Sequence, residues 1–173
     1  MTPFTIGRVL GARGLGGELR LQTFRSDPAY FRAKKLSLVP SAGPPSTFRI
    51  QSLRSTDPKT HVVALEGLSD RTAAEGWIGA KVELSAAWFA PGEGPLESLM
   101  GALTIDDATG APLGRIVSLA HNGAQDLVGI DRGGAEPVLL PWVEAFVRQI
   151  QAGEGGSLTV RIHRIEGLLE DEA

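Results

Sequence analysis

The 173-residue chain contains no cysteine, so neither disulfide bonds nor thiolate metal sites support its fold. This absence is compatible with a reducing cytoplasm. Long apolar runs are also missing, since no stretch approaches the roughly 20 apolar residues that a membrane-spanning helix needs. The opening MTPFTIGRVL lacks the basic segment and apolar core of a secretory signal. We therefore expect a soluble, cytoplasmic protein that does not associate with a membrane.

Catalytic and metal-binding motifs are missing as well. His61, His121 and His163 are widely separated and do not have the spacing of zinc ligands. Asp106 and Asp107 open a turn, but the alternating oxygen ligands of a calcium loop do not follow them. The nucleophile motif G-x-S-x-G does not occur either. We expect no catalytic residues and no metal.

Acidic residues are scarce in the first third of the chain and abundant in the remainder. Residues 1–60 hold ten Lys or Arg against three Asp or Glu, a formal charge of +7. Residues 61–173 hold seven against seventeen, a formal charge of −10. A basic region suits an RNA backbone, and an acidic region suits a basic protein. An uneven division of solvated surface charge is the alternative that charge alone leaves open.

Glycine is plentiful in the stretch GRVLGARGLGGELRL, where five glycines fall between Gly7 and Gly17. Their order fits neither the dinucleotide fingerprint G-x-G-x-x-G nor a phosphate loop ending in G-K-[ST]. The following ELRLQTF alternates polar and apolar residues, which indicates a strand rather than a helix. The pattern favours a glycine-rich hairpin, with Glu18 and Arg20 on one strand face and within reach of each other.

Short strands separated by turns dominate the first half. Ser69 or Asp70 is expected to cap a short helix that ends near Gly76. A linker is expected over residues 86–99, where prolines and glycines interrupt any regular pattern. Six short strands and one short helix suggest a small closed barrel, which leaves no exposed sheet edge. The expected strands lie near residues 4–10, 17–25, 36–39, 47–55, 60–66 and 80–84.

The second half repeats this rhythm, and a second small barrel is the simplest account. Its three evident turns are DDATGAP, HNGAQ and RGGAE. The Asn122-Gly123 pair favours a type I′ turn. Pro141 interrupts a strand, and the apolar spacing of residues 142–147 predicts a short helix. A last strand is expected over residues 157–163.

Five motifs, in order, resemble those of the RimM family of ribosome maturation factors. GRVLGARGLGGELRLQTFRSDP is similar to the family's strand, glycine-rich turn and second strand, and LEGLSDRTAAEGWIGAKVEL is similar to its helix and following glycine. The other three matches are NGAQDLV, VLLPWVEAFV and IEGLL. The resemblance covers almost the entire chain, and five ordered motifs are more specific than any single one.

This resemblance implies a mainly all-β fold of two small β-barrels with short helices. Residues 1–88 would form a barrel like those of translation factors, 89–97 a linker, and 98–173 a PRC-barrel. The family's members are non-catalytic assembly factors, without a cofactor, that bind the immature small ribosomal subunit near its head and assist 16S rRNA processing. The implied partners are 16S rRNA and the small-subunit protein numbered nineteen, and nothing requires more than a monomer.

Contacts with rRNA or ribosomal protein are expected on both barrels. In the first barrel the candidates are Arg13, Gly14, Gly17, Glu18 and Arg20. In the second barrel the candidates are Asn122, Gly123, Asp126, Pro141 and Trp142. For the glycines and the Asn-Gly pair the alternative is a purely local role in backbone geometry. For the arginines it is a solvated surface position, and for the Pro-Trp pair it is core packing.

One segment departs from the family pattern. Gly94 and Pro95 stand where the family has two adjacent tyrosines, and Ser98 replaces an aspartate. Because those tyrosines matter for subunit binding in the family, the resemblance implies that this contact differs here. The candidate replacements are Trp88, Phe89 and Leu96.

Two other functions stay open. A PRC-barrel protein-binding module with a partner other than the ribosome would show no salt-dependent affinity for rRNA. An enzyme using the glycine loop would be stabilised by a nucleotide, because a ligand that binds the native state raises its stability.

Overall fold

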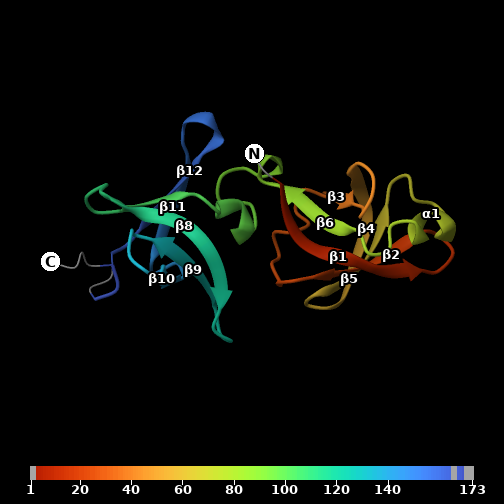
Figure 1. The fold of residues 1–173 in the computed structure, drawn as a ribbon, viewed down its shortest axis with the longest axis horizontal. Helices are drawn as coiled ribbons and strands as arrows, with labels where there is room; N and C mark the ends of the chain where they lie inside the picture. Colours follow the sequence, from red (N-terminus) through yellow and green to blue (C-terminus); the bar gives the residue numbers. More distant parts are fainter. Residues whose placement is uncertain (1–2, 165–166, 170–173) are drawn as a thin grey trace. The chain divides into compact units, whose positions relative to one another are not determined.

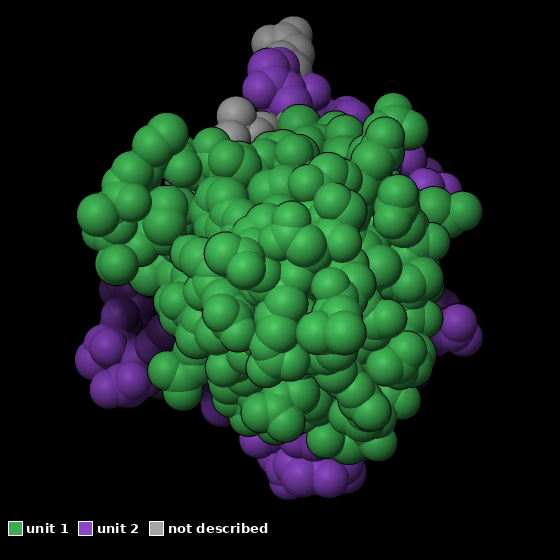
Figure 2. Space-filling model, turned by 90° about the vertical axis from the view of Figure 1, so that its right-hand side faces the viewer, with its two compact units in different colours: residues 1–89 green, residues 90–173 purple. Residues whose placement is uncertain are grey.

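A computed structural model describes residues 3–164 and 167–169 (Figure 1). The chain divides into two compact units, residues 1–89 and 90–173, which Figure 2 colours separately. Across the described residues, no helix has both the length and the apolar character needed to cross a membrane. Ile165 and Glu166, which begin the IEGLL motif, lie outside the described residues.

The first unit is a closed barrel in which neighbouring strands follow the order β1-β2-β5-β4-β3-β6. The strands are β1 (Pro3–Arg13), β2 (Glu18–Thr23), β3 (Lys35–Val39), β4 (Ser46–Asp57), β5 (Thr60–Leu65) and β6 (Lys81–Ser85). Side chains alternate along the strands between the interior and the exterior of the barrel. In β2, Leu19 and Leu21 are buried, and Arg20 between them is exposed. The six strands expected in this part of the sequence are all present.

The helix α1 (Arg71–Glu75) is the capped helix expected from the sequence. The Asp70 side chain accepts a hydrogen bond from the Ala73 N–H at 2.8 Å, which satisfies one of the free donors of the first turn. Ala74 is buried, and the helix packs against β1 and β2. Figure 1 shows it beside the turn that joins these two strands.

The second unit contains a six-stranded sheet in the order β10-β9-β8-β7-β12-β11. The strands are β7 (Leu103–Asp106), β8 (Pro112–His121), β9 (Asp126–Asp131), β10 (Val138–Pro141), β11 (Val147–Ala152) and β12 (Leu158–Ile162). Neighbours pair antiparallel except β12 and β7, which are parallel. The core side chains include Ile116, Val128, Ile130, Leu140, Val160 and Ile162, all fully buried.

Three short 3-10 helices are described in the chain, one in the first unit and two in the second. They are η1 (Ala86–Trp88), η2 (Leu96–Leu99) and η3 (Glu154–Gly156).

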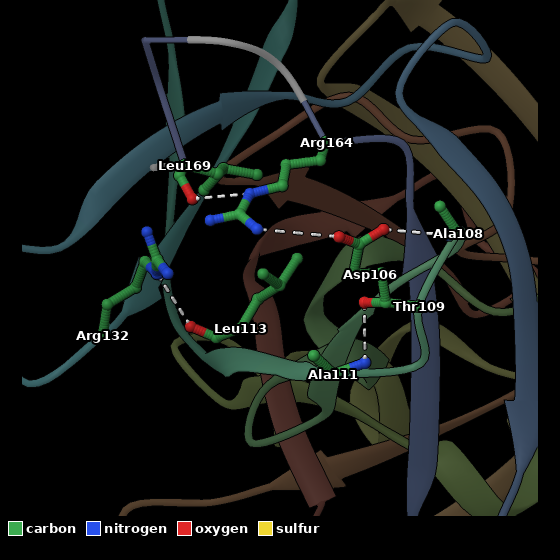
Figure 3. Close-up of polar contacts among 8 residues, drawn as sticks. All are labelled: Asp106, Ala108, Thr109, Ala111, Leu113, Arg132, Arg164 and Leu169. Atoms are coloured by element: carbon green, nitrogen blue, oxygen red, sulfur yellow. Dashed lines mark hydrogen bonds and ion pairs between the residues drawn. The ribbon is translucent and has the colours of Figure 1, made fainter. Parts of the chain in front are cut away.

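A polar contact holds the segment after β12 against this sheet (Figure 3). Arg164 Nε donates to the Leu169 carbonyl at 3.2 Å, and Arg164 Nη1 lies 3.9 Å from Asp106 Oδ2. Asp106 is buried, and its other oxygen accepts from the Ala108 N–H at 2.9 Å. The Leu169 side chain is fully buried in the second core. Arg164 and Leu169, which follow β12, therefore contribute to the packing of this unit.

The helix expected over residues 142–147 is wrong. The N–H groups of Phe146 and Val147 both donate to the Val143 carbonyl, which makes a single turn, and β11 begins at Val147. The Phe146 carbonyl then accepts from the His163 N–H at 2.7 Å. The chain thus leaves the turn to pair with the end of β12 instead of continuing as a helix.

The turn between β8 and β9 also differs from the expectation. Four residues, 122–125, join the strands, and Asn122 Oδ1 accepts from the N–H groups of Ala124 and Gln125, both at 2.9 Å. Of the Asn-Gly pair only Gly123 has a positive φ, 91°. A type I′ turn needs a positive φ at both central residues. The type I′ prediction is therefore wrong, because the Asn122 side chain closes a wider loop.

Candidate functional site

The β1–β2 hairpin brings together the candidates of the first barrel. In its register Arg13 lies opposite Glu18, and Gly11 lies opposite Arg20. The register shifts between Val9 and Gly11, as in a β-bulge, and bulges reorient the side chains that follow them. Cross-strand partners share a face, so Arg13 and Arg20 both lie on the outer side of the barrel wall, where they are exposed.

Two of the glycines shape the hairpin. Gly17 is buried with φ 85°, and a Cβ there would lie 2.7 Å from the Leu68 carbonyl oxygen. Only glycine fits this position, which presses the hairpin against the loop that precedes α1. Gly14 has φ 66° and is exposed, and its carbonyl accepts from Arg71 Nη1 at 3.4 Å. Gly17 therefore serves the geometry of the loop, whereas Gly14 is still accessible to a partner.

Glu18 pairs with an arginine that the sequence did not suggest. Its carboxylate lies 3.2 Å from Arg54 Nη2 on β4, not beside Arg20. Arg54 and Arg20 both lie opposite Val62 on β5, so the two cations flank this buried valine on the outer face. Among the described residues, the side chains of Arg13 and Arg20 make neither a hydrogen bond nor an ion pair. The hairpin therefore presents two arginines that no carboxylate neutralises.

A hollow of about 310 Å³ lies between these arginines and is lined by Gly11, Ala12, Arg13 and Arg20. A Cβ at Gly11 would meet no atom within 4 Å, so the missing side chain leaves this space open. Guanidinium groups donate paired hydrogen bonds to phosphate or carboxylate oxygens. The hollow thus has the charge and the donors to hold an anionic group.

Leu15 is an exposed apolar residue that sequence reasoning missed. It lies in the loop of the hairpin, between Gly14 and Gly16, and is 84% exposed. Its position between two glycines in a loop could have predicted this exposure, because a large apolar side chain has no core to enter there. An apolar group beside Arg13 gives the hairpin a surface for a base or for an apolar partner side chain.

The candidates of the second barrel also come together. Asp126 begins β9 opposite His121, and its carbonyl accepts from the Trp142 N–H at 2.9 Å. Pro141 ends β10 opposite Leu127, so it lies next to the same end of β9. Trp142 packs partly against the second core and is partly exposed. These residues form one corner, at the turn that holds Asn122 and Gly123.

The segment that departs from the family pattern is ordered by local bonds. The Pro95 carbonyl accepts from the Ser98 hydroxyl at 2.6 Å and from the Ser98 N–H at 2.9 Å, at the start of η2. Leu96 is buried in the second core, so the expectation that it offers a surface to a partner is wrong. Trp88 and Phe89 are partly buried against the first core.

His61 has the features of a core histidine. It is buried, its Nδ1 lies 2.8 Å from the Ser55 hydroxyl, and Phe31 contacts its ring edge to face. Burial lowers the pKa of His61, and the nearby Asp57 carboxylate opposes this shift only in part. Within the described residues, no group of three or more His, Asp or Glu side chains could hold a metal.

The formal charges of the two units are opposite. Residues 1–89 hold twelve Lys or Arg against seven Asp or Glu, a charge of +5. Residues 90–173 hold five against thirteen, a charge of −8. Each unit therefore suits a different kind of partner, the first an anionic one and the second a cationic one.

Comparison with known proteins matches both units to one family. The family model described as the RimM N-terminal domain matches residues 4–87, and the RimM PRC barrel domain matches residues 96–160. The fold expected from the resemblance, a RimM N-terminal domain followed by a PRC barrel, is thereby confirmed. A solution structure of the N-terminal domain of RimM from Thermus thermophilus covers 53% of this chain and 98% of its own, with 28% identity and a TM-score of 0.43.

Curated relatives span nearly the same length. The ribosome maturation factor RimM of Nocardioides sp. is 34% identical over 96% of this chain and 95% of its own. That of Gloeobacter violaceus is 33% identical over 97% of this chain and 93% of its own. These relatives are named ribosome maturation factors, which supports the expectation that the chain is not an enzyme. With both domain models matched in order and relatives this similar over their whole lengths, the chain belongs to the RimM family.

Proposed function

We propose that this protein is a cytoplasmic, non-catalytic ribosome maturation factor that binds the immature small ribosomal subunit near its head and assists 16S rRNA processing. Its family supports the class of function, since relatives are named ribosome maturation factors. The observation that carries the choice of partners is the separation of charge, with +5 on the first unit and −8 on the second.

The first unit engages rRNA through the β1–β2 hairpin. Arg13 and Arg20 are exposed and have no partner among the described residues, so they are available to phosphate oxygens. Each phosphate that they neutralise releases counterions, which makes the affinity fall with salt. Gly14 and Leu15 lie in the same loop and add backbone and apolar contacts.

The second unit engages a basic ribosomal protein, the small-subunit protein numbered nineteen. Its net negative charge attracts such a partner, and the corner formed by Asp126, Pro141 and Trp142 supplies an aromatic anchor. Tryptophan is enriched among the residues that dominate protein interfaces. A factor bound to both rRNA and protein favours the conformation of the head in which both sites are formed, by differential affinity.

The test is co-sedimentation of the full chain with immature and mature small subunits across a salt series. We expect preferential binding to the immature particle, lost at high salt and in Arg13→Glu/Arg20→Glu. The matched control is Arg8→Glu/Lys81→Glu, which changes the charge equally at two exposed cross-strand partners on β1 and β6. This control should retain binding, because neither residue lines the hollow.

Two results would overturn the proposal. A folded protein that binds neither particle has a different partner. A protein that binds another polypeptide, with no salt-dependent affinity for rRNA, acts as a PRC-barrel binding module outside the ribosome.

A further inference from the structure

Resting on the proposed function, we infer that the hollow between Arg13 and Arg20 is a subsite for one unstacked nucleotide of single-stranded RNA. The phosphate lies between the two guanidinium groups, and the base lies over the backbone at Gly11. The first unit would then recognise RNA by its single-stranded form as well as by its negative charge.

The phosphate position follows from the pairing of Glu18. This carboxylate is the cross-strand neighbour of Arg13, yet it lies 3.2 Å from Arg54. Arg13 and Arg20 are therefore not neutralised from within the chain, as far as the described residues show. A phosphate can accept paired hydrogen bonds from either guanidinium without displacing an internal partner.

The base position follows from the size and floor of the hollow. Its volume of about 310 Å³ lies at the lower end of the range of pockets that hold small ligands, roughly 300 Å³. Two of the four lining residues, Gly11 and Ala12, carry little or no side chain, so the floor is mainly backbone. A planar base fits such a floor, and an arginine guanidinium can stack on its face.

These features favour single-stranded over double-stranded RNA. In an A-form duplex each base is stacked between its neighbours, and the deep, narrow major groove keeps side chains from reading the base edges. Only a base released from the stack, as in a loop, a bulge or an end, can enter a hollow of this size. Leu15, 84% exposed in the adjoining loop, offers an apolar surface to the neighbouring base.

An acidic protein segment is the competing ligand, since arginines also bind carboxylates. A carboxylate would satisfy the guanidinium groups but leave the Gly11 floor open. The open floor is the reason that we favour a nucleotide.

The test measures binding of the full chain to a labelled oligouridylate by fluorescence anisotropy, beside an RNA duplex of equal length. The decisive variant is Gly11→Gln, which fills the hollow without changing charge. Gly11 is free of positive φ and a Cβ there meets nothing, so the barrel tolerates the side chain. Gly16→Gln is the matched control, since Gly16 shares both properties but does not line the hollow.

We expect the single strand to bind more tightly than the duplex. Gly11→Gln should weaken the single strand about tenfold, the effect of losing one stacked base, and leave the duplex unchanged. Gly16→Gln should bind both as the unchanged protein does. Arg13→Gln/Arg20→Gln should weaken both RNAs and reduce the dependence of the affinity on salt.

The outcomes separate this inference from the proposed function. If Gly11→Gln binds like the unchanged protein while Arg13→Gln/Arg20→Gln weakens binding to RNA and subunits, the arginines act on the backbone alone and the nucleotide subsite is overturned. If polyglutamate of equal length competes as well as RNA, the ligand is an acidic protein segment and the subsite is also overturned. If Gly11→Gln weakens the single strand as expected but the protein does not sediment with subunits, the subsite stands and the proposed function fails.

Discussion

The Glu18 carboxylate lies 3.2 Å from the Arg54 guanidinium, although its cross-strand neighbour is Arg13. The pair spans from β2 to β4 across β5, so it exists only because β5 lies between these two strands in the sheet. It neutralises Arg54 on β4 and leaves Arg13 and Arg20 of the hairpin free for a ligand. Under the proposed function, Glu18 thus acts on RNA binding indirectly, by determining which arginine is occupied.

Removing this carboxylate should strengthen RNA binding. In Glu18→Gln the Arg54 side chain becomes a further free cation on the same outer face, and one negative charge disappears. We expect a higher affinity for single-stranded RNA and a steeper salt dependence, by roughly one phosphate contact. The exposed pair contributes at most about 1 kcal/mol to folding, so stability should change little. Anisotropy titrations at several salt concentrations measure this, and Glu18→Gln/Arg54→Gln should return the slope to its original value. An unchanged affinity in Glu18→Gln would contradict the role assigned to the pair.

Gly17 should tolerate no side chain. Its φ of 85° costs an L-residue about 1–2 kcal/mol, and a Cβ would lie 2.7 Å from the Leu68 carbonyl oxygen. We expect Gly17→Ala to lower the free energy of unfolding of the first unit by about 2 kcal/mol or more. Urea unfolding followed through amide resonances of β1 and β2 reports this unit. Gly16→Ala is the control, and equal losses in both variants would refute the argument.

His61 should make the first unit less stable in mild acid. Burial lowers its pKa in the folded state below the ordinary value of 6.5, so below that pH the unfolded chain binds a proton that the folded chain resists. The free energy of unfolding should therefore fall as the pH drops from 6.5 towards the folded pKa, by at most about 1.4 kcal/mol per pH unit. Above this range His61 contributes no pH dependence. Unfolding titrations between neutral and mildly acidic pH should show a smaller loss in His61→Gln, which cannot titrate; identical profiles would argue against this origin.

The segment after β12 should stabilise the second unit selectively. Leu169 is fully buried, and its carbonyl is held by Arg164, which also faces the buried Asp106. We expect Leu169→Ala to destabilise this unit by about 2–5 kcal/mol. Hydrogen exchange in β7 and β12 should rise, while exchange in the first barrel stays unchanged. Leu139→Ala, at a position 47% exposed, should have little effect and serves as the control.

Local patterns in the sequence predict most of the first barrel. The alternation around Leu19 and Leu21 and the capping residue Asp70 depend on neighbours close in the chain, and the structure has both features. The ion pair of Glu18 could not be predicted in this way. Its partner Arg54 becomes a neighbour only through the order of the strands, whereas within β2 the nearest cation is Arg20.

The error at residues 142–147 has a similar cause. The apolar residues there form a single turn that packs on the core. Their spacing is compatible with a short helix as well as with a single turn, so it does not distinguish the two. The bond that ends the turn, from the His163 N–H to the Phe146 carbonyl, joins segments distant in sequence. Likewise the hollow depends on the register of Gly11 with Arg20 across a bulge, which composition and spacing do not reveal.

The position of β12 between β7 and β11 in its sheet sets an order of events during synthesis. The first barrel takes all its strands from residues up to Ser85, whereas β7 gains its second neighbour only when residues 158–162 have emerged. Domains generally fold as units, with the N-terminal one first. A nascent chain therefore acquires its basic unit well before its acidic unit is complete. Under the proposed function, a chain interrupted between the two would keep the arginines proposed to bind rRNA but would lack the acidic unit proposed to bind a ribosomal protein.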